Sequence, residues 1–182
     1  MTAIEWLDSL SPWPRDGFGL ERMRSFLAAL GDPQTAYPAI HVVGTNGKST
    51  ATMTIEQLLL SEALSVGSTI SPHVESWRER IRIDGAEADF EAAVALVRPE
   101  AERLRATQFE IVTAAALAAF AEAVVDVAVV EAGLGGRLDA TNVLRTRVVL
   151  LTNVGLDHTD VLDGEHSRPW PRRDVGRLEL EL

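Results

Sequence analysis

Apolar positions follow two spacings along the chain, one typical of helices and one typical of buried strands. Short apolar runs rich in β-branched residues predict strands at 39–43, 66–70, 124–130 and 147–152. Longer segments with helical spacing of apolar residues predict helices at 4–10, 20–30, 48–62, 87–105 and 108–123. The alternating residues 80–83, followed by Asp84-Gly85, predict a small hairpin. Continuous apolar strands separated by helices indicate an α/β fold of three layers, with a mostly parallel sheet covered on both faces.

Composition places the chain among ordinary globular proteins and excludes several classes. The 182 residues are 46% hydrophobic and 24% charged, which suits one domain with its own core. The formal net charge of −10 argues against a nucleic-acid-binding surface. There is no cysteine, and no apolar run approaches the roughly 18 residues of a membrane helix. The acidic start of the chain does not resemble a secretory signal. We therefore expect a cytoplasmic protein with no nucleic-acid or membrane partner. A monomer is expected, but the sequence leaves the oligomeric state open.

Lys48 is the single lysine among 17 basic residues, and all the others are arginine. A compact ammonium group on a flexible stem differs physically from a planar guanidinium group. One retained lysine therefore indicates a position where arginine does not suffice.

That lysine lies in a glycine-rich segment, residues 44–50, between the strand at 39–43 and the helix at 48–62. The backbone N–H groups of such a loop and the start of a helix bind phosphate, while a lysine offsets its charge. The strict phosphate-loop pattern needs a glycine where Val42 stands, so only a shorter form is present. A glycine-rich turn with a hydroxyl helix cap is the alternative. The residues predicted to bind the nucleotide are Gly44, Thr45, Asn46, Gly47, Lys48, Ser49 and Thr50.

Glu131 follows the apolar strand at 124–130 directly. A carboxylate at the carboxyl end of a parallel strand, beside a phosphate loop, is well placed to bind Mg²⁺. Capping of the following glycine-rich turn is the alternative interpretation.

Several short motifs lie between Gly19 and Leu162: LERM at 20–23, DPQ at 32–34, HVVGTNGK at 41–48, SPH at 71–73, RERIR at 78–82, EAGLGGRLDATN at 131–142 and LDHT at 156–159. Together they resemble the successive motifs of the dihydrofolate synthase/folylpolyglutamate synthase family of the Mur ligase superfamily. The resemblance implies the central-domain fold of the Mur ligases. Ser49 departs from the family, which usually has glycine there, and is shared with the wall-building Mur ligases.

The resemblance implies an ATP-dependent ligase of folate biosynthesis, with ATP and Mg²⁺ as cofactors. The carboxylate of dihydropteroate or folate attacks the γ-phosphate to give an acyl phosphate, and the amine of L-glutamate then displaces phosphate. Lys48, Glu131 and His158 are the implied catalytic residues, and Ser71, Glu131 and His158 the implied metal ligands. Whether the reaction is first glutamate addition, chain extension or both is left open.

The resemblance also implies residues that contact the pterin. Thr107 and Glu110 form a capping box before an apolar helix, and this local explanation suffices. A similar family motif lies near the pterin, so the implied substrate residues are Phe109, Glu110, Arg137, Leu138 and Asp139.

The resemblance to the family ends near Asp163-Gly164. We expect an ATP-binding domain at 1–164, incomplete at its end, followed by an aberrant or disordered tail at 165–182. No lysine follows Lys48 in this sequence, so the carbamylated lysine that the resemblance implies has no counterpart here. We also expect the C-terminal glutamate-ligase domain of the family to be absent. We therefore expect weak or no ligase activity. The alternatives are a non-catalytic MgATP-binding remnant and a fragment of a cell-wall Mur ligase.

Overall fold

The structure is a computed structural model that describes residues 1–12, 19–134 and 137–155. His158 and the predicted tail at 165–182 lie outside the described residues. The helices and strands, in chain order, are α1 (Ala3–Asp8), α2 (Glu21–Ala29), η1 (Pro33–Thr35), β1 (Ala39–Val43), α3 (Lys48–Ser61), β2 (Val66–Thr69), η2 (Trp77–Arg80), β3 (Arg82–Ile83), β4 (Ala86–Glu87), α4 (Phe90–Leu104), α5 (Gln108–Glu122), β5 (Val127–Glu131), η3 (Ala140–Val143) and β6 (Thr146–Leu151).

The strands form one mixed sheet with the order β4-β3-β2-β5-β1-β6. β2, β5, β1 and β6 run parallel, whereas β3 and β4 form an antiparallel hairpin on one edge. Each parallel pair is connected through at least one helix, as parallel strands require. The predicted α/β fold with a mostly parallel sheet is therefore confirmed.

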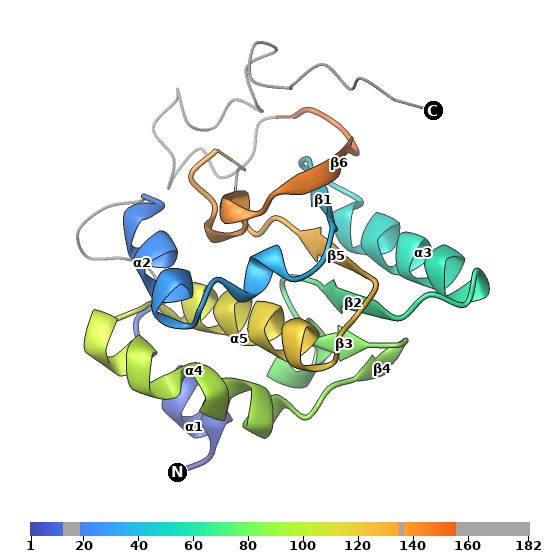
Figure 1. Cartoon of the computed structure of the whole chain (residues 1–182). Helices are drawn as coiled ribbons and strands as arrows, with labels where there is room; N and C mark the ends of the chain where they lie inside the picture. Colours follow the sequence, from blue (N-terminus) through green and yellow to red (C-terminus); the bar gives the residue numbers. More distant parts are fainter. Residues whose placement is uncertain (13–18, 135–136, 156–182) are drawn as a thin grey trace.

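Helices cover both faces of the sheet, which gives the predicted three layers (Figure 1). α3 packs on β1, β2 and β5 from one side. α5 packs on β2 from the other side, and α4 and α2 pack against α5, with α1 on α4. The larger hydrophobic cluster lies on the α5 side, while the smaller cluster is built around Val42, Val66 and Val129. Gly67 permits the close approach of α5, because a Cβ atom there would lie 2.5 Å from the ring of Phe120.

Two strand boundaries differ from the sequence prediction by more than one residue. β5 begins at Val127 rather than at residue 124, because Val124 is exposed and takes a left-handed φ of 55° in the turn after α5. Arg80 lies in the short helix η2, so the strand of the predicted hairpin is only Arg82–Ile83. Of the helices that the structure describes, none is long and apolar enough to cross a membrane.

Candidate functional site

The carboxyl ends of the four parallel strands lie along one edge of the sheet, and the candidate residues follow these ends. The phosphate loop, residues 44–50, joins β1 to α3. Ser71 follows β2, Glu131 ends β5, and Asn153 follows β6. Ligands of open α/β sheets bind at this edge, so the topology places residues from all four strands in one candidate site.

The phosphate loop has the turn geometry that its glycines predict. Gly44 has φ 136° and Gly47 has φ 78°, both in the region that favours glycine. The Lys48 ammonium group donates to the carbonyl oxygens of Gly44 (2.9 Å) and Thr45 (3.2 Å). Lys48 is also the first residue of α3, so the loop places both a cation and a helix N-terminus at one point.

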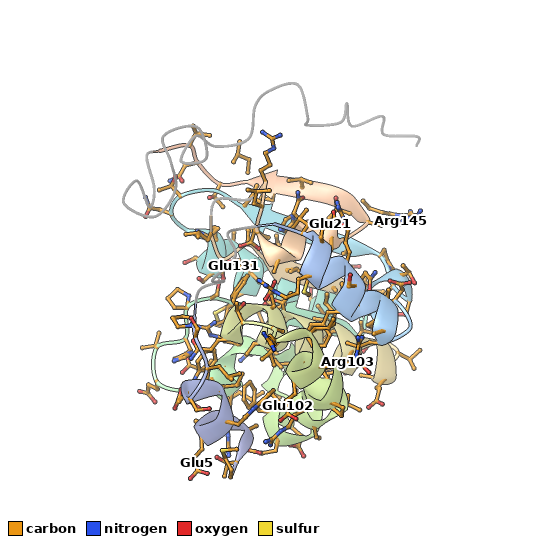
Figure 2. All side chains as sticks on the ribbon, turned by 90° about the vertical axis from the view of Figure 1, so that its left-hand side faces the viewer. Glu5, Glu21, Glu102, Arg103, Glu131 and Arg145 are labelled. Carbon is orange, nitrogen blue, oxygen red and sulfur yellow. The ribbon has the colours of Figure 1, made fainter. Side chains whose placement is uncertain are left out.

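Glu131 connects the phosphate loop to the segment after β2. Its side chain is buried, with 2% of the residue exposed. One carboxylate oxygen accepts from the Ser49 hydroxyl (2.9 Å), and the other accepts from the Ser71 backbone N–H (3.1 Å). Glu131 thus lies inside the molecule, whereas the side chains of Glu5 on α1 and Glu102 on α4 are exposed (Figure 2).

Burial raises the pKa of the Glu131 carboxyl group, and this cause outweighs the others. The hydrogen bonds from Ser71 and Ser49 and the charges of Lys48 and Arg80 act in the opposite direction. A buried carboxylate beside two cations is an arrangement typical of functional sites.

The donor set at Glu131 fits a Mg²⁺ ion. The hydroxyl oxygen of Ser71 is buried and has no hydrogen-bond partner among the described residues, which is a costly state unless a ligand satisfies it. Mg²⁺ prefers oxygen ligands and is usually held by one or two carboxylates together with water and substrate phosphates. Within the described ranges, no three His, Asp or Glu side chains gather as a metal cluster. Ser71 and Glu131 would therefore hold the ion together with phosphate oxygens.

Arg80 is a site residue to which the sequence analysis assigned no role. Its Nε donates to Nδ1 of His73 (2.9 Å), and its guanidinium carbon lies 4.4 Å from the centre of the Trp77 ring. Burial and the Arg80 charge lower the pKa of His73, which favours the neutral ring that this hydrogen bond needs. His73 and Trp77 thus hold the Arg80 guanidinium group near Glu131. In the sequence, only the motif at 78–82 indicated Arg80.

The predicted capping box at the start of α5 is confirmed. The Thr107 side chain accepts from the Glu110 backbone N–H, and a Glu110 oxygen accepts from the Thr107 N–H and hydroxyl, both at 2.8 Å. Arg22 Nε lies 2.9 and 3.0 Å from the two oxygens of the same carboxylate. Glu110 therefore joins α2 to the start of α5 from a buried position.

The second loop, residues 132–142, follows β5, and its described part is anchored from inside. The Asp139 carboxylate is buried and accepts from the Leu134 N–H (2.7 Å) and from the N–H and hydroxyl of Thr141. The Thr141 hydroxyl also lies 2.8 Å from Nε2 of His41 in β1. Burial raises the pKa of Asp139 and lowers that of His41 to about 4.

The other predicted substrate residues lie near this second loop. Phe109 packs on its start, because a Cβ atom at Gly133 would lie 2.4 Å from the ring. Arg137 is exposed and Leu138 is half-buried. The structure thus brings Lys48, Ser49, Ser71 and Glu131 into one group and places Phe109 at the loop that follows Glu131.

Comparison with known proteins agrees with this geometry. Residues 42–166 match the model of the Mur ligase middle domain. The chain is 39% identical over 175 residues to the dihydrofolate synthase/folylpolyglutamate synthase of Mycobacterium tuberculosis, covering 87% of this chain and 36% of that protein. It is 38% identical over 177 residues to the Escherichia coli protein of the same name, covering 96% of this chain and 40% of that protein.

Solved structures give the same result. E. coli FolC in complex with DHPP and ADP matches with a TM-score of 0.78 at 38% identity, covering 90% of this chain and 41% of that one. An FPGS-AMPPCP-folate complex matches with a TM-score of 0.80 at 40% identity, covering 87% of this chain and 41% of that one. The chain therefore spans between 36% and 41% of the length of these relatives. Since the match to the middle-domain model covers most of the chain, the chain belongs to the Mur ligase family.

Proposed function

We propose that the chain carries the MgATP-binding site of a ligase that joins L-glutamate to dihydropteroate or folate. The buried Glu131 carboxylate supports this most: it accepts from the Ser49 hydroxyl and the Ser71 N–H, beside a Ser71 hydroxyl that has no hydrogen-bond partner among the described residues. Relatives at 38% and 40% identity in complexes with ADP or AMPPCP, and with DHPP or folate, support the choice of nucleotide and substrate class.

The phosphate loop would bind the nucleotide through its N–H groups and through Lys48. The first N–H groups of α3, which begins at Lys48, have no partner inside the helix and are available to phosphate oxygens. The Lys48 ammonium group would exchange its contacts with the carbonyls of Gly44 and Thr45 for contacts with phosphate. This offsets negative charge during phosphoryl transfer, in which positioning and electrostatics dominate.

Ser71 and Glu131 would hold Mg²⁺ beside the loop, with His158 as the further ligand expected from the family resemblance. When bound, the ion offsets charge on the transferring phosphoryl group. The Ser49 and Ser71 hydrogen bonds keep the Glu131 carboxylate in place, so that its oxygens stay near the loop.

The acceptor substrate would lie along the second loop. Phe109, Arg137 and Leu138 are the residues that we propose to contact the pterin, while Glu110 and Asp139 hold the helix and loop that carry them. In the proposed reaction the substrate carboxylate attacks the γ-phosphate and releases ADP. The amine of L-glutamate then attacks the acyl phosphate, and phosphate leaves as the amide forms.

Calorimetric titration of the 182-residue chain with MgATP tests the nucleotide site. We expect binding that Lys48→Ala weakens about 100-fold, as for loss of a charge-assisted contact to phosphate. Glu131→Gln should remove the dependence on Mg²⁺, and Glu122→Gln, an exposed carboxylate at the end of α5, serves as the matched control. Absence of MgATP binding, or equal affinity of the Lys48→Ala variant, would contradict the proposal.

The substrate class needs a separate titration. With MgATP present, the chain should bind dihydropteroate or folate and not a UDP-muramyl peptide. Preference for the UDP-muramyl peptide would favour a cell-wall ligase instead. MgATP binding without binding of either acceptor would favour a nucleotide-binding module. Glutamate-dependent release of ADP measures the ligase activity itself.

A further inference from the structure

We propose that Thr152 and Asn153, the two residues after β6, form a clamp that sets the shape of the phosphate loop. In this clamp Asn153 is a positioning residue for phosphate binding. The inference rests on the proposed nucleotide site and adds a residue pair to it. The apolar pattern predicts residue 152 only as the end of a strand, and it gives Asn153 no role.

The clamp holds both backbone groups of Asn46, in the middle of the loop. The Asn46 N–H donates to the side-chain oxygen of Asn153 (2.9 Å). The Thr152 hydroxyl donates to the Asn46 carbonyl oxygen (2.8 Å). The side chains of Asn153 and Thr152 thus hold the peptide bond before Asn46 through its N–H and the peptide bond after Asn46 through its carbonyl oxygen. These two hydrogen bonds restrict rotation of the loop backbone at Asn46.

The preceding loop residue is held in the same way. The Thr45 N–H lies 3.0 Å from the side-chain oxygen of Asn153 and 3.3 Å from its carbonyl oxygen. The Thr45 hydroxyl accepts from the N–H of Gly155 (2.9 Å). The loop and the segment after β6 therefore form one hydrogen-bonded unit, although about 110 residues separate them in the chain.

Gly44 allows the loop to lie directly on the clamp. A Cβ atom at Gly44 would lie 2.2 Å from the Thr152 hydroxyl oxygen and 3.0 Å from backbone atoms of Asn153. Any side chain at position 44 would have to displace Thr152 or Asn153. Glycine is therefore required at this position by the close contact with the clamp as well as by its φ of 136°.

The clamp divides the N–H groups of the loop into two sets. Asn153 takes the N–H groups of Thr45 and Asn46, at the start of the loop. The N–H groups at the start of α3, from Lys48 onward, remain for phosphate. A neutral amide oxygen is the better acceptor for the Thr45 and Asn46 N–H groups at this place. The carboxylate of an aspartate would accept the same hydrogen bonds but would repel the bound phosphates.

The test compares Asn153→Ala and Asn153→Asp with Val154→Ala, a change of an exposed neighbour, in the full 182-residue chain. Asn153→Ala should weaken binding of MgATP and of inorganic triphosphate by the same factor, about tenfold, because the clamp acts only on the phosphate site. Asn153→Asp should also bind weakly, but its deficit relative to the parent should shrink as salt screens the added charge. Val154→Ala should match the parent.

Amide hydrogen exchange of the ligand-free chain gives a second readout that does not depend on nucleotide binding. Asn153→Ala should speed exchange at Thr45 and Asn46, and Asn153→Asp should restore their protection while MgATP binding stays weak. Unchanged affinity in Asn153→Ala, or tighter binding because the amide competes with phosphate, would overturn the proposal, as would unchanged exchange. If the parent chain itself binds no MgATP, the proposed function fails, and exchange at the two amides still decides whether the clamp exists.

Discussion

The phosphate loop and the second loop both follow parallel strands at the same edge of the sheet, yet they are stabilised in different ways. The phosphate loop is partly exposed, and its contacts come from Lys48, from Glu131 and from residues after β6. The second loop is anchored by the buried Asp139, which connects through Thr141 to His41 in the core. One loop leaves polar groups for a ligand, and the other uses its polar groups to fix its own shape.

This difference predicts that substitutions in one loop mainly affect stability and substitutions in the other mainly affect nucleotide binding. Changes in the second loop should lower the free energy of unfolding, because buried polar groups lose their partners. Changes in the phosphate loop should mainly lower nucleotide affinity, because its exposed groups can be solvated when a contact is lost.

The largest effect is expected for Asp139→Ala. The change leaves the N–H of Leu134 and the N–H and hydroxyl of Thr141 without their acceptor in a buried place. We expect the free energy of unfolding to fall by about 3 kcal/mol in urea denaturation. Glu122→Ala, at an exposed carboxylate, should change it by less than about 0.5 kcal/mol. A loss below about 1 kcal/mol in Asp139→Ala would mean that Asp139 does not anchor the second loop.

A pH dependence of stability should follow from His41. Its pKa is lowered to about 4 by burial, so the unfolded chain takes up a proton near pH 6.5 before the folded chain does. This contribution to stability is fully present above pH 6.5 and is lost as the pH falls toward 4. It should amount to about 2 kcal/mol between pH 7.5 and pH 5.

Urea denaturation of the parent and of His41→Gln at both pH values isolates this contribution from those of other groups. The parent should lose more stability than the variant on acidification. Equal losses would show that His41 is protonated as readily in the folded chain as in the unfolded one.

Gly133→Ala and Gly44→Ala compare the two loops with one chemical change. At Gly133 the new Cβ atom would lie 2.4 Å from the Phe109 ring, and such overpacking should cost about 1–2 kcal/mol of unfolding free energy. The double variant Gly133→Ala/Phe109→Leu should recover part of that loss. If the single variant is as stable as the parent, the ring does not pack on the loop as the structure shows.

Gly44→Ala should have the smallest effect on stability. Its Cβ atom would displace Thr152, and the φ of 136° disfavours alanine, but the loop is partly exposed and can shift. We expect a loss of about 1 kcal/mol in unfolding and at least about tenfold weaker MgATP binding by calorimetry. The reverse result, a large loss of stability with parent-like affinity, would remove the contrast between the loops.

Local patterns were enough to predict most of the fold and the phosphate loop. The helix at 48–62 and the strand at 39–43 are found as α3 and β1, because their spacing, length and flanking glycines agree. The strand predicted from residue 124 starts later, since an apolar run alone does not reveal that Val124 turns in the left-handed region. The capping box of Thr107 and Glu110 was also readable, because both residues lie within one helical turn.

Contacts between distant segments were not readable in the same way. His41 and Thr141 are 100 residues apart, and nothing in either local sequence signals their hydrogen bond. Asp139 was predicted to contact substrate, but the structure buries its carboxylate among groups of its own loop. Asn153 carried one available signal, since it follows a strand predicted to end at the same edge of the sheet as the phosphate loop. Using that signal would have required the strand order.

We propose that Ser71 and Glu131 bind the metal of a nucleotide held by the phosphate loop. Crystals of the chain grown with Mn²⁺ and AMPPCP would locate this metal through its anomalous signal. We expect one peak within bonding distance of the Ser71 hydroxyl and the Glu131 carboxylate, next to phosphates on the N–H groups at the start of α3. A metal bound away from both residues, or a nucleotide bound away from the loop, would contradict it.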